Sequence, residues 1–306
     1  MYSGIAYNLY IDSGARVSID SIRLKFVYKY QNYSWTKGFA VTSIDKLSAV
    51  IDSVFFIFQD CDIQWTYHDF FKIGSYCRTC RVSGNDWSFA VLFGRYVYDS
   101  LCRNVAPEIV LDLNPNKVPM DIIHRFIRIL ADTALSSSLV RFDVAFDFPF
   151  PRDEVLLLRS ADSRKSYRLF LDHGSKTEYQ GPRAAHGSLK LYDKSAESGL
   201  PVPVTRCELT LDGSKLESLP DLFPKLYRFA GYQLDVSFAD LPFPVRACLK
   251  HPDLLDDMLQ SVTYKTRVKY LSILDSLQGC VLTVDDWPRV LNFLSSALSE
   301  YRRVML

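Results

Sequence analysis

Hydrophobic and polar residues alternate along much of the first two thirds of this chain, and alternation with period two predicts strands that bury one face. Residues 18–30, SIDSIRLKFVYKY, are the clearest early example. Turns rich in glycine, proline and asparagine bound the later stretches. The predicted strands span residues 18–30, 63–71, 76–82, 87–93, 108–113, 140–148, 167–171, 176–180, 188–193 and 204–211.

Apolar residues at helical spacing predict two helices among these strands, over residues 43–58 and 120–135. Ser43 is the expected N-cap of the first. After residue 212 the pattern changes, and helices are predicted over residues 216–229, 252–262, 265–277 and 286–303. We therefore divide the chain into residues 1–212 and a mainly helical region, residues 213–306. The expected fold class is α+β, with a central, mainly antiparallel sheet flanked by helices and a helical C-terminal region.

Composition narrows the class of protein. The chain has 306 residues, of which 48% are hydrophobic, and this is enough for a sizeable core. Its net charge of +1 argues against a nonspecific, histone-like nucleic-acid binder, although a local basic groove is compatible with it. The seven cysteines have irregular spacing, and the single C-x-x-C, Cys77 to Cys80, lacks the second ligand pair of a zinc site.

Neither a secretory signal nor an uninterrupted apolar stretch of about 18 residues is visible in the sequence. Together with the cysteine pattern, this leads us to expect a cytoplasmic protein that does not enter a membrane.

Residues 141–211 combine chemically active side chains with apolar strands. Alternation places Asp143 and Asp147 on one face of the strand 140–148. Arg206 and Glu208 likewise share a face of the strand 204–211. If these strands pair with residues 188–194, one sheet face would present Asp143, Asp147, Lys190, Tyr192, Lys194, Arg206 and Glu208.

The side chains on this face are of the kinds that a metal-assisted attack on a phosphodiester needs. Carboxylates at ligand distance bind Mg²⁺ or Mn²⁺, and the metal polarises a phosphodiester. A tyrosine oxygen can attack phosphorus and form a phosphotyrosine. Its ordinary pKa of about 10 keeps the phenol protonated at neutral pH, and a nearby cation would favour the phenolate. Lys194 is close enough in sequence to Tyr192 for that role, while Arg183 and Arg206 could hold flanking phosphates.

Residues 176–194, KTEYQGPRAAHGSLKLYDK, resemble the nicking motif of rolling-circle replication initiators of the replication-initiation-factor family, found in plasmids and some phages. That motif is similar to T-x-Y-x-G-x-R, about eight residues, then Y-[ND]-K. The matching residues are Thr177, Tyr179, Gly181, Arg183, Tyr192, Asp193 and Lys194. RFDVAFD (141–147) resembles the family's acidic strand and TRCEL (205–209) its arginine–glutamate strand. The resemblance covers about 70 residues well and extends loosely to NPNK at 114–117.

The resemblance implies that Tyr192 attacks one strand at a replication origin, becomes linked to the 5′ phosphate and leaves a 3′ hydroxyl for a polymerase. Reversal of the same transesterification would close the displaced circle. The implied metal ligands for Mg²⁺ or Mn²⁺ are Asp143, Asp147 and Glu208, in a subset that the motif leaves open. Lys194 and Arg183 are the implied phosphate contacts, and Lys190 and Arg206 are further candidate contacts to DNA phosphates. The implied partners are origin DNA, both as duplex and as single-stranded nick site, a host helicase and a second copy of the chain.

Several features depart from the family pattern or have a simpler interpretation. Ala185 stands where the family often has a serine, and the His–apolar–His pair of other nicking enzymes is absent. His186 is expected to be an exposed loop residue, and Tyr179 a packing residue. Lys265, Arg267 and Lys269 lie between tyrosines and could contact the phosphates of duplex DNA, or form only a solvated helix face. The last helix could support dimerisation.

Other functions remain open at this point. The main alternative is a non-catalytic, origin-binding regulator of replication or transcription, which would bind duplex DNA with salt-dependent affinity but would not cut it. A metal-dependent phosphodiesterase that activates water would cut DNA without forming a covalent adduct. A structural protein without a nucleic-acid role is the simplest alternative.

Overall fold

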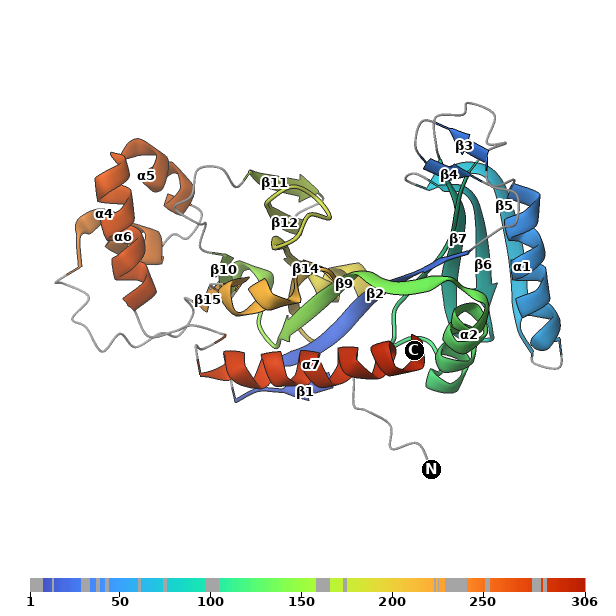
Figure 1. Ribbon diagram of the computed structural model, residues 1–306. Coiled ribbons are helices and arrows are strands. Elements are labelled where there is room, and N and C mark those ends of the chain that lie inside the picture. The colour runs from blue at the N-terminus through green and yellow to red at the C-terminus, as the bar shows by residue number, and fades with distance from the viewer. Residues whose placement is uncertain are drawn as a thin grey trace.

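One antiparallel sheet organises the chain in the computed structural model (Figure 1). The structure describes residues 8–12, 14–28, 34–36, 39–41, 44–59, 62–73, 76–96, 105–157, 166–172, 175–222, 224, 226–228, 241–250, 254–276, 282 and 285–305. The strand order is β11-β12-β13-β14-β9-β2-β8-β7-β6-β5, and β1 also pairs with β2. With helices on the sheet, the fold is α+β, and the expected fold class is confirmed.

The strands of the sheet have these bounds: β1 Asn8–Tyr10, β2 Arg16–Val27, β5 Gln64–Ile73, β6 Tyr76–Ser83, β7 Ser88–Tyr96, β8 Val105–Leu113, β9 Ser136–Phe148, β11 Tyr167–Asp172, β12 Ser175–Gln180, β13 Ser188–Asp193 and β14 Thr205–Asp212. Two short antiparallel pairs stand outside it. They are β3 Ser34–Thr36 with β4 Phe39–Val41, and β10 Val155–Leu157 with β15 Leu226–Arg228.

Strands β2 and β9 join the two halves of the sheet, because they are long enough, at 12 and 13 residues, to pair differently at each end. The first half of β2 pairs with the end of β9 that also pairs with β14. The second half of β2 pairs with β8. The register between β2 and β9 shifts between Ile19 and Ser21, and a shift of this kind bends a strand and redirects a side chain. Asp20 lies at this shift.

The apolar face of the sheet carries the main core. Phe142, Val144, Phe146 and Phe148 alternate along β9, and all four are fully buried. Helices α1 (Ile44–Ile57), α2 (Met120–Thr133) and α7 (Asp286–Met305) pack on this face. Stacked rings of Phe58 and Phe126, with centroids 4.3 Å apart, join the end of α1 to α2.

A second, smaller core forms in the C-terminal third. Helices α4 (Phe243–Lys250), α5 (Leu255–Ser261) and α6 (Tyr264–Ser276) share it. Its buried residues are Leu241, Val245, Cys248, Leu255, Leu259 and Leu274. Since α7 belongs to the main core, the residues after position 212 divide between two cores. In Figure 1, α4 to α6 lie to the left of the sheet and α7 lies below it.

The prediction of an α-helix over residues 216–229 is wrong. The structure has a 3₁₀-helix, η2 (Leu216–Leu222), followed by strand β15. Pro220 and Pro224 explain the difference, because proline lacks the amide hydrogen and its ring clashes with the preceding turn of an α-helix. Helix α4 was not expected, and Ser43, the expected N-cap of α1, lies outside the described residues. Among the described helices, none has the length and apolar character needed to cross a membrane.

Candidate active site

The register of three neighbouring strands brings the polar residues together on the face opposite the main core. Tyr192 of β13 lies opposite Arg206 of β14, and Arg206 lies opposite Asp147 of β9. Two residues further along, Lys190 lies opposite Glu208. Because side chains alternate between faces, these five residues point to the same side of the sheet.

The hydroxyl of Tyr192 donates a hydrogen bond to Oε1 of Glu208 at 2.7 Å. The Tyr192 side chain is buried, with 4% of its surface exposed. Burial and the neighbouring Glu208 carboxylate raise the pKa of Tyr192, so the phenol is neutral at physiological pH. Burial also raises the pKa of Glu208. The pair therefore combines a protonated nucleophile with a carboxylate that is a better proton acceptor than one in water.

Two lysines lie against the same tyrosine. The Lys190 ammonium is 3.7 Å from the centroid of the Tyr192 ring and 3.8 Å from Oε2 of Glu208. The Lys194 ammonium is 5.9 Å from that centroid and forms an ion pair with Glu197. Both lysine positions favour a negative charge on the phenol oxygen, although each ammonium already has a carboxylate partner.

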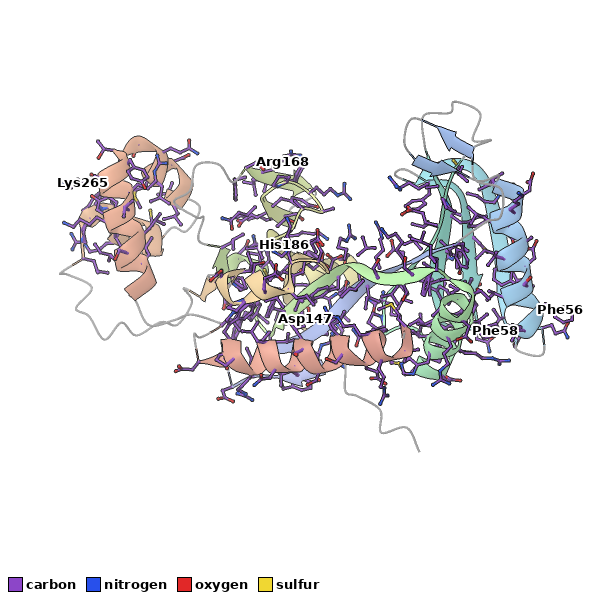
Figure 2. The ribbon with its side chains drawn as sticks, viewed as in Figure 1. Phe56, Phe58, Asp147, Arg168, His186 and Lys265 are labelled. Carbon is purple, nitrogen blue, oxygen red and sulfur yellow. The ribbon has the colours of Figure 1, made fainter. Side chains whose placement is uncertain are left out.

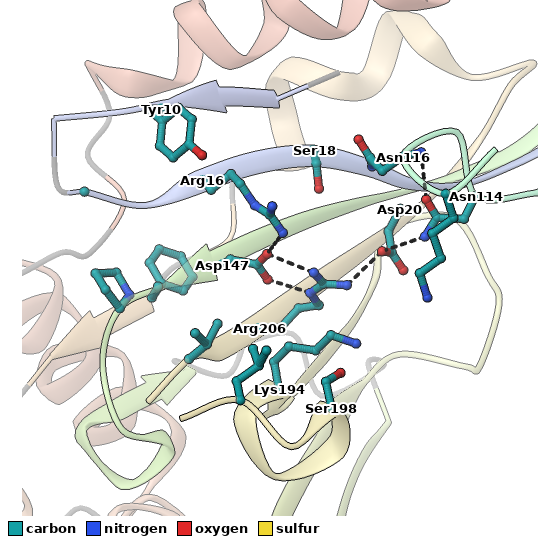
Figure 3. A pocket seen from close by; sticks show the side chains of 16 residues that line it. Tyr10, Arg16, Ser18, Asp20, Asn114, Asn116, Asp147, Lys194, Ser198 and Arg206 are labelled. Atoms are coloured by element: carbon teal, nitrogen blue, oxygen red, sulfur yellow. Dashed lines mark hydrogen bonds and ion pairs between the residues drawn. The ribbon is translucent and has the colours of Figure 1, made fainter. Parts of the chain in front are cut away.

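Asp147 and Arg206 form a buried, two-pronged ion pair (Figure 3). The Arg206 guanidinium also lies 2.7 Å from Oδ1 of Asp20, and Arg16 lies 2.6 Å from Oδ2 of Asp147. Burial alone would raise the pKa of Asp147, but its bonds to Arg206 and Arg16 outweigh burial and lower it. Both oxygens of Asp147 are thus engaged by guanidinium groups. The sequence pointed to Asp147 as a metal ligand and Arg206 as a phosphate contact, whereas in the fold the two side chains hold each other.

Asp143 lies at the wall of a cavity of about 270 Å³, which it shares with Glu208, Lys190, Tyr179 and Arg183. Its Oδ1 atom is buried and has no hydrogen-bond partner among the described residues. Its Oδ2 atom is 3.3 Å from the guanidinium of Arg141. Burial raises the pKa of Asp143, against the opposing effect of that arginine. Within the described part of the chain, no three acidic, histidine or cysteine side chains are grouped as a ready metal site.

Lys194 lines a larger cavity, of about 580 Å³ (Figure 3). Arg16, Arg206 and Lys117 contribute to its wall. Residues of the NPNK segment also line this cavity. The side-chain amide of Asn116 donates to the carbonyl of Ile19 at 2.6 Å. Asn114 of the same segment donates to Asp20 at 3.1 Å. Lys190 thus lines one cavity and Lys194 the other, and both ammonium groups lie against the buried ring of Tyr192.

The loop from Gly181 to Gly187 carries the first half of the motif and has a constrained backbone. Ala184 adopts a left-handed conformation, with φ of 61°, which is strained for a residue with a Cβ. Arg183 beside it is exposed at the cavity and makes no ion pair or hydrogen bond among the described residues.

His186 is tied into this loop, contrary to the expectation of an exposed loop side chain. Its Nδ1 accepts the backbone N–H of Asp212 at 3.0 Å, and its Nε2 lies 2.7 Å from the hydroxyl of Ser218. Burial and nearby Lys215 lower the pKa of His186. A neutral ring with its proton on Nε2 fits these contacts, so His186 fastens the motif loop to the end of β14. No pattern in the sequence indicates this role, since both partners come from later segments.

The three basic residues of α6 are not equivalent. Lys265 and Lys269 are exposed, and Figure 2 shows Lys265 on the helical unit away from the sheet. The Nε of Arg267 instead donates to the carbonyl of Leu259 at 2.7 Å and so links α6 to α5. Lys265 and Lys269 therefore remain available to a partner, while Arg267 has a structural bond.

Comparison with known proteins adds little to this geometry. No protein family matches the sequence, and no curated protein matches it at a significant level. Among solved structures, the rolling circle replication initiator protein from Geobacillus stearothermophilus is 13% identical, with a TM-score of 0.38 over 67% of this chain and 77% of the other. That similarity is too low to carry over residue roles.

Proposed function

We propose that this protein is an origin-specific DNA nickase and strand transferase that initiates rolling-circle replication, with Tyr192 as its nucleophile. The hydrogen bond from Tyr192 to Glu208, at 2.7 Å, carries the proposal. It supplies what a tyrosine nucleophile needs at neutral pH, which is a fixed acceptor for the phenol proton. The motif of residues 176–194 surrounds this pair and gives the reaction its class.

In the proposed step, Tyr192 Oη attacks the phosphorus of one phosphodiester while its proton passes to Glu208. The bond from phosphorus to the 3′ oxygen breaks, and that oxygen takes up a proton from solvent and leaves as a 3′ hydroxyl. The 5′ phosphate remains attached to Tyr192. The charge of the phosphodiester is unchanged, and attack of a 3′ hydroxyl on the phosphotyrosine reverses the step. Lys190 would stabilise the developing charge on the phenol oxygen, and Lys194 could hold the adjacent phosphate.

A divalent metal would be held by Asp143 and Glu208. They line one cavity, and the buried Oδ1 of Asp143 has no hydrogen-bond partner within the described part of the chain, so it is the oxygen that a cation could use. Two carboxylates are enough for Mg²⁺, because it usually keeps several of its waters. When bound, Mg²⁺ or Mn²⁺ would polarise the scissile phosphodiester. Arg183, at the same cavity, would position a neighbouring phosphate.

The origin duplex would be contacted by α6. Lys265 and Lys269 are exposed on the same helix, and basic side chains of this kind position a protein on the phosphate backbone. This contact would hold the origin while the sheet acts on one strand.

The test is covalent capture of a single-stranded origin oligonucleotide, labelled on the 3′ side of the nick site, with Mn²⁺, followed by a denaturing protein gel. The unaltered protein should form a labelled adduct, Tyr192→Phe should form none, and Tyr179→Phe should still form it. Both substitutions remove one hydroxyl and keep the ring, so they are matched.

The alternatives give different results in the same experiment. A phosphodiesterase that activates water would cut the oligonucleotide and leave no adduct. A non-catalytic regulator would bind the duplex and give neither product. An adduct that persists in Tyr192→Phe would exclude Tyr192 as the nucleophile.

A further inference from the structure

The hairpin of β11 and β12 extends the active face of the sheet beyond the cavity. Arg168 lies opposite Tyr179, and Phe170 lies opposite Thr177, so these four residues are on one face. Tyr179 in turn lies opposite Lys190. The polar face therefore continues from Glu208 to the edge strand β11.

Two aromatic rings form a corner on this hairpin. Phe170 and Tyr179 have centroids 5.5 Å apart and planes at 87°. Phe170 is 53% exposed, although a phenylalanine on an ordinary sheet would be covered. Tyr179 also lines the cavity that holds Asp143 and Glu208. The corner is thus open to solvent on one side and continuous with the candidate active site on the other.

Positive charge flanks the two rings. Arg168 is exposed on the hairpin, as Figure 2 shows, and Arg183 is exposed at the cavity. Within the described residues, neither arginine has an ion pair or hydrogen bond. Aromatic rings between unpaired cations match a single-stranded nucleic acid, which offers base faces and phosphates at short intervals.

We propose that Phe170 and Tyr179 form a stacking platform for unpaired bases of the DNA strand that enters the cavity beside Tyr192. This inference rests on the proposed nickase function, and it assigns the exposed hairpin to the single-stranded flank of the nick site. A base would stack on the open face of Phe170 and meet Tyr179 at its edge. Arg168 and Arg183 would contact the phosphates on either side. Duplex DNA would not use the platform, because its base faces are already stacked.

The experiment measures equilibrium binding of a fluorescein-labelled thymidine oligonucleotide to the full-length protein by anisotropy. Phe170→Leu should weaken binding about 5- to 150-fold, the usual effect of losing one stacked base. Phe170→Tyr, which keeps a ring, should bind nearly as well as the unaltered protein. Leu171→Ala is the matched control, because Leu171 is also exposed on β11 but faces the other side of the hairpin.

Salt dependence tests the arginines separately. Arg168→Gln should reduce the slope of log affinity against log salt by about 0.7, the value for one phosphate contact on a single strand. Phe170→Leu should leave that slope unchanged. The inference is overturned if Phe170→Leu binds the oligonucleotide like the unaltered protein, or if Leu171→Ala weakens binding as much.

The two proposals fail in different ways. If Phe170→Leu weakens oligonucleotide binding and Tyr192 forms no adduct, the platform stands and the nickase assignment falls. If the adduct forms and Phe170→Leu binds normally, the nickase stands and the platform falls. Binding is measured without metal, so adduct formation does not influence it.

Discussion

Arg206 holds both carboxylate oxygens of Asp147, through Nε at 2.5 Å and Nη2 at 2.8 Å. The pair joins β14 to β9. Tyr192 lies on the next strand, β13, directly opposite Arg206. Both side chains are buried, with less than a tenth of their surface exposed. This buried pair therefore holds the strands beside the candidate nucleophile in place.

Breaking this pair should destabilise the protein. Asp147→Ala leaves the buried guanidinium of Arg206 short of its main partner, and the free energy of unfolding should fall by about 3–5 kcal/mol. The pair of Arg23 and Asp112 lies on the same face but is about one-quarter exposed, so Arg23→Gln should cost less than about 1 kcal/mol. Urea unfolding followed by circular dichroism measures both. Equal losses would mean that burial does not set the strength of these pairs.

The same pair predicts how stability responds to acid. Because the pKa of Asp147 is lowered in the fold, its contribution is complete above the ordinary aspartate pKa and is lost as pH falls through the lowered value. The pKa of Glu208 is raised, so the pH dependence of its contribution is the reverse. The stability that Glu208 contributes is present at low pH and is lost as pH rises through the raised pKa.

Lys190 should matter to adduct formation more than to folding. Its ammonium lies against the Tyr192 ring and near Glu208, so Lys190→Met removes a charge beside the forming phenolate. The rate of adduct formation should fall by about 10²-fold. Lys176→Met is the control, because Lys176 pairs with Glu178 on the opposite face of the sheet. Single-turnover rates of oligonucleotide capture provide the measurement, and similar rates for both variants would remove Lys190 from the mechanism.

Adduct formation should lose rate in acid through protonation of Glu208. A carboxyl must be ionised to accept the phenol proton, and burial raises its pKa. The rate should therefore rise with pH through a value above the roughly 4.3 of free glutamate and then level off. Single-turnover capture between about pH 4.5 and 8 checks this. The assignment fails if Glu208→Gln retains both the unaltered rate and the same acid limb.

Relief of strain in the motif loop should stabilise the fold. Ala184 has φ of 61°, so Ala184→Gly removes a left-handed strain of about 1–2 kcal/mol, partly offset by the greater freedom of glycine in the unfolded chain. Ala185, its neighbour, does not have a positive φ, so Ala185→Gly should lower stability by about 0.4–1 kcal/mol. Thermal unfolding of the two variants should move in opposite directions. Movement in the same direction would show that the loop backbone is not strained at Ala184.

Local pattern was enough to predict most strands and the face on which each polar residue lies. The alternation in VRFDVAFDFPF puts Asp143 and Asp147 on one face of β9 and its phenylalanines on the other, because successive strand residues point to opposite faces. Helices α1, α2, α6 and α7 follow from apolar spacing in the same way. The prediction failed over residues 216–229, where two prolines outweigh helical spacing.

The sequence by itself determined which residues are polar, which face they share, and that Tyr192 lies in a motif that resembles a nicking site. Only the tertiary structure decided that Glu208 bonds Tyr192, that Arg206 is held by Asp147 and Asp20, and that α7 returns to the main core. The physical reason is that alternation fixes a side chain's face, whereas its partner depends on the register between distant strands. That register is set by packing of the whole sheet.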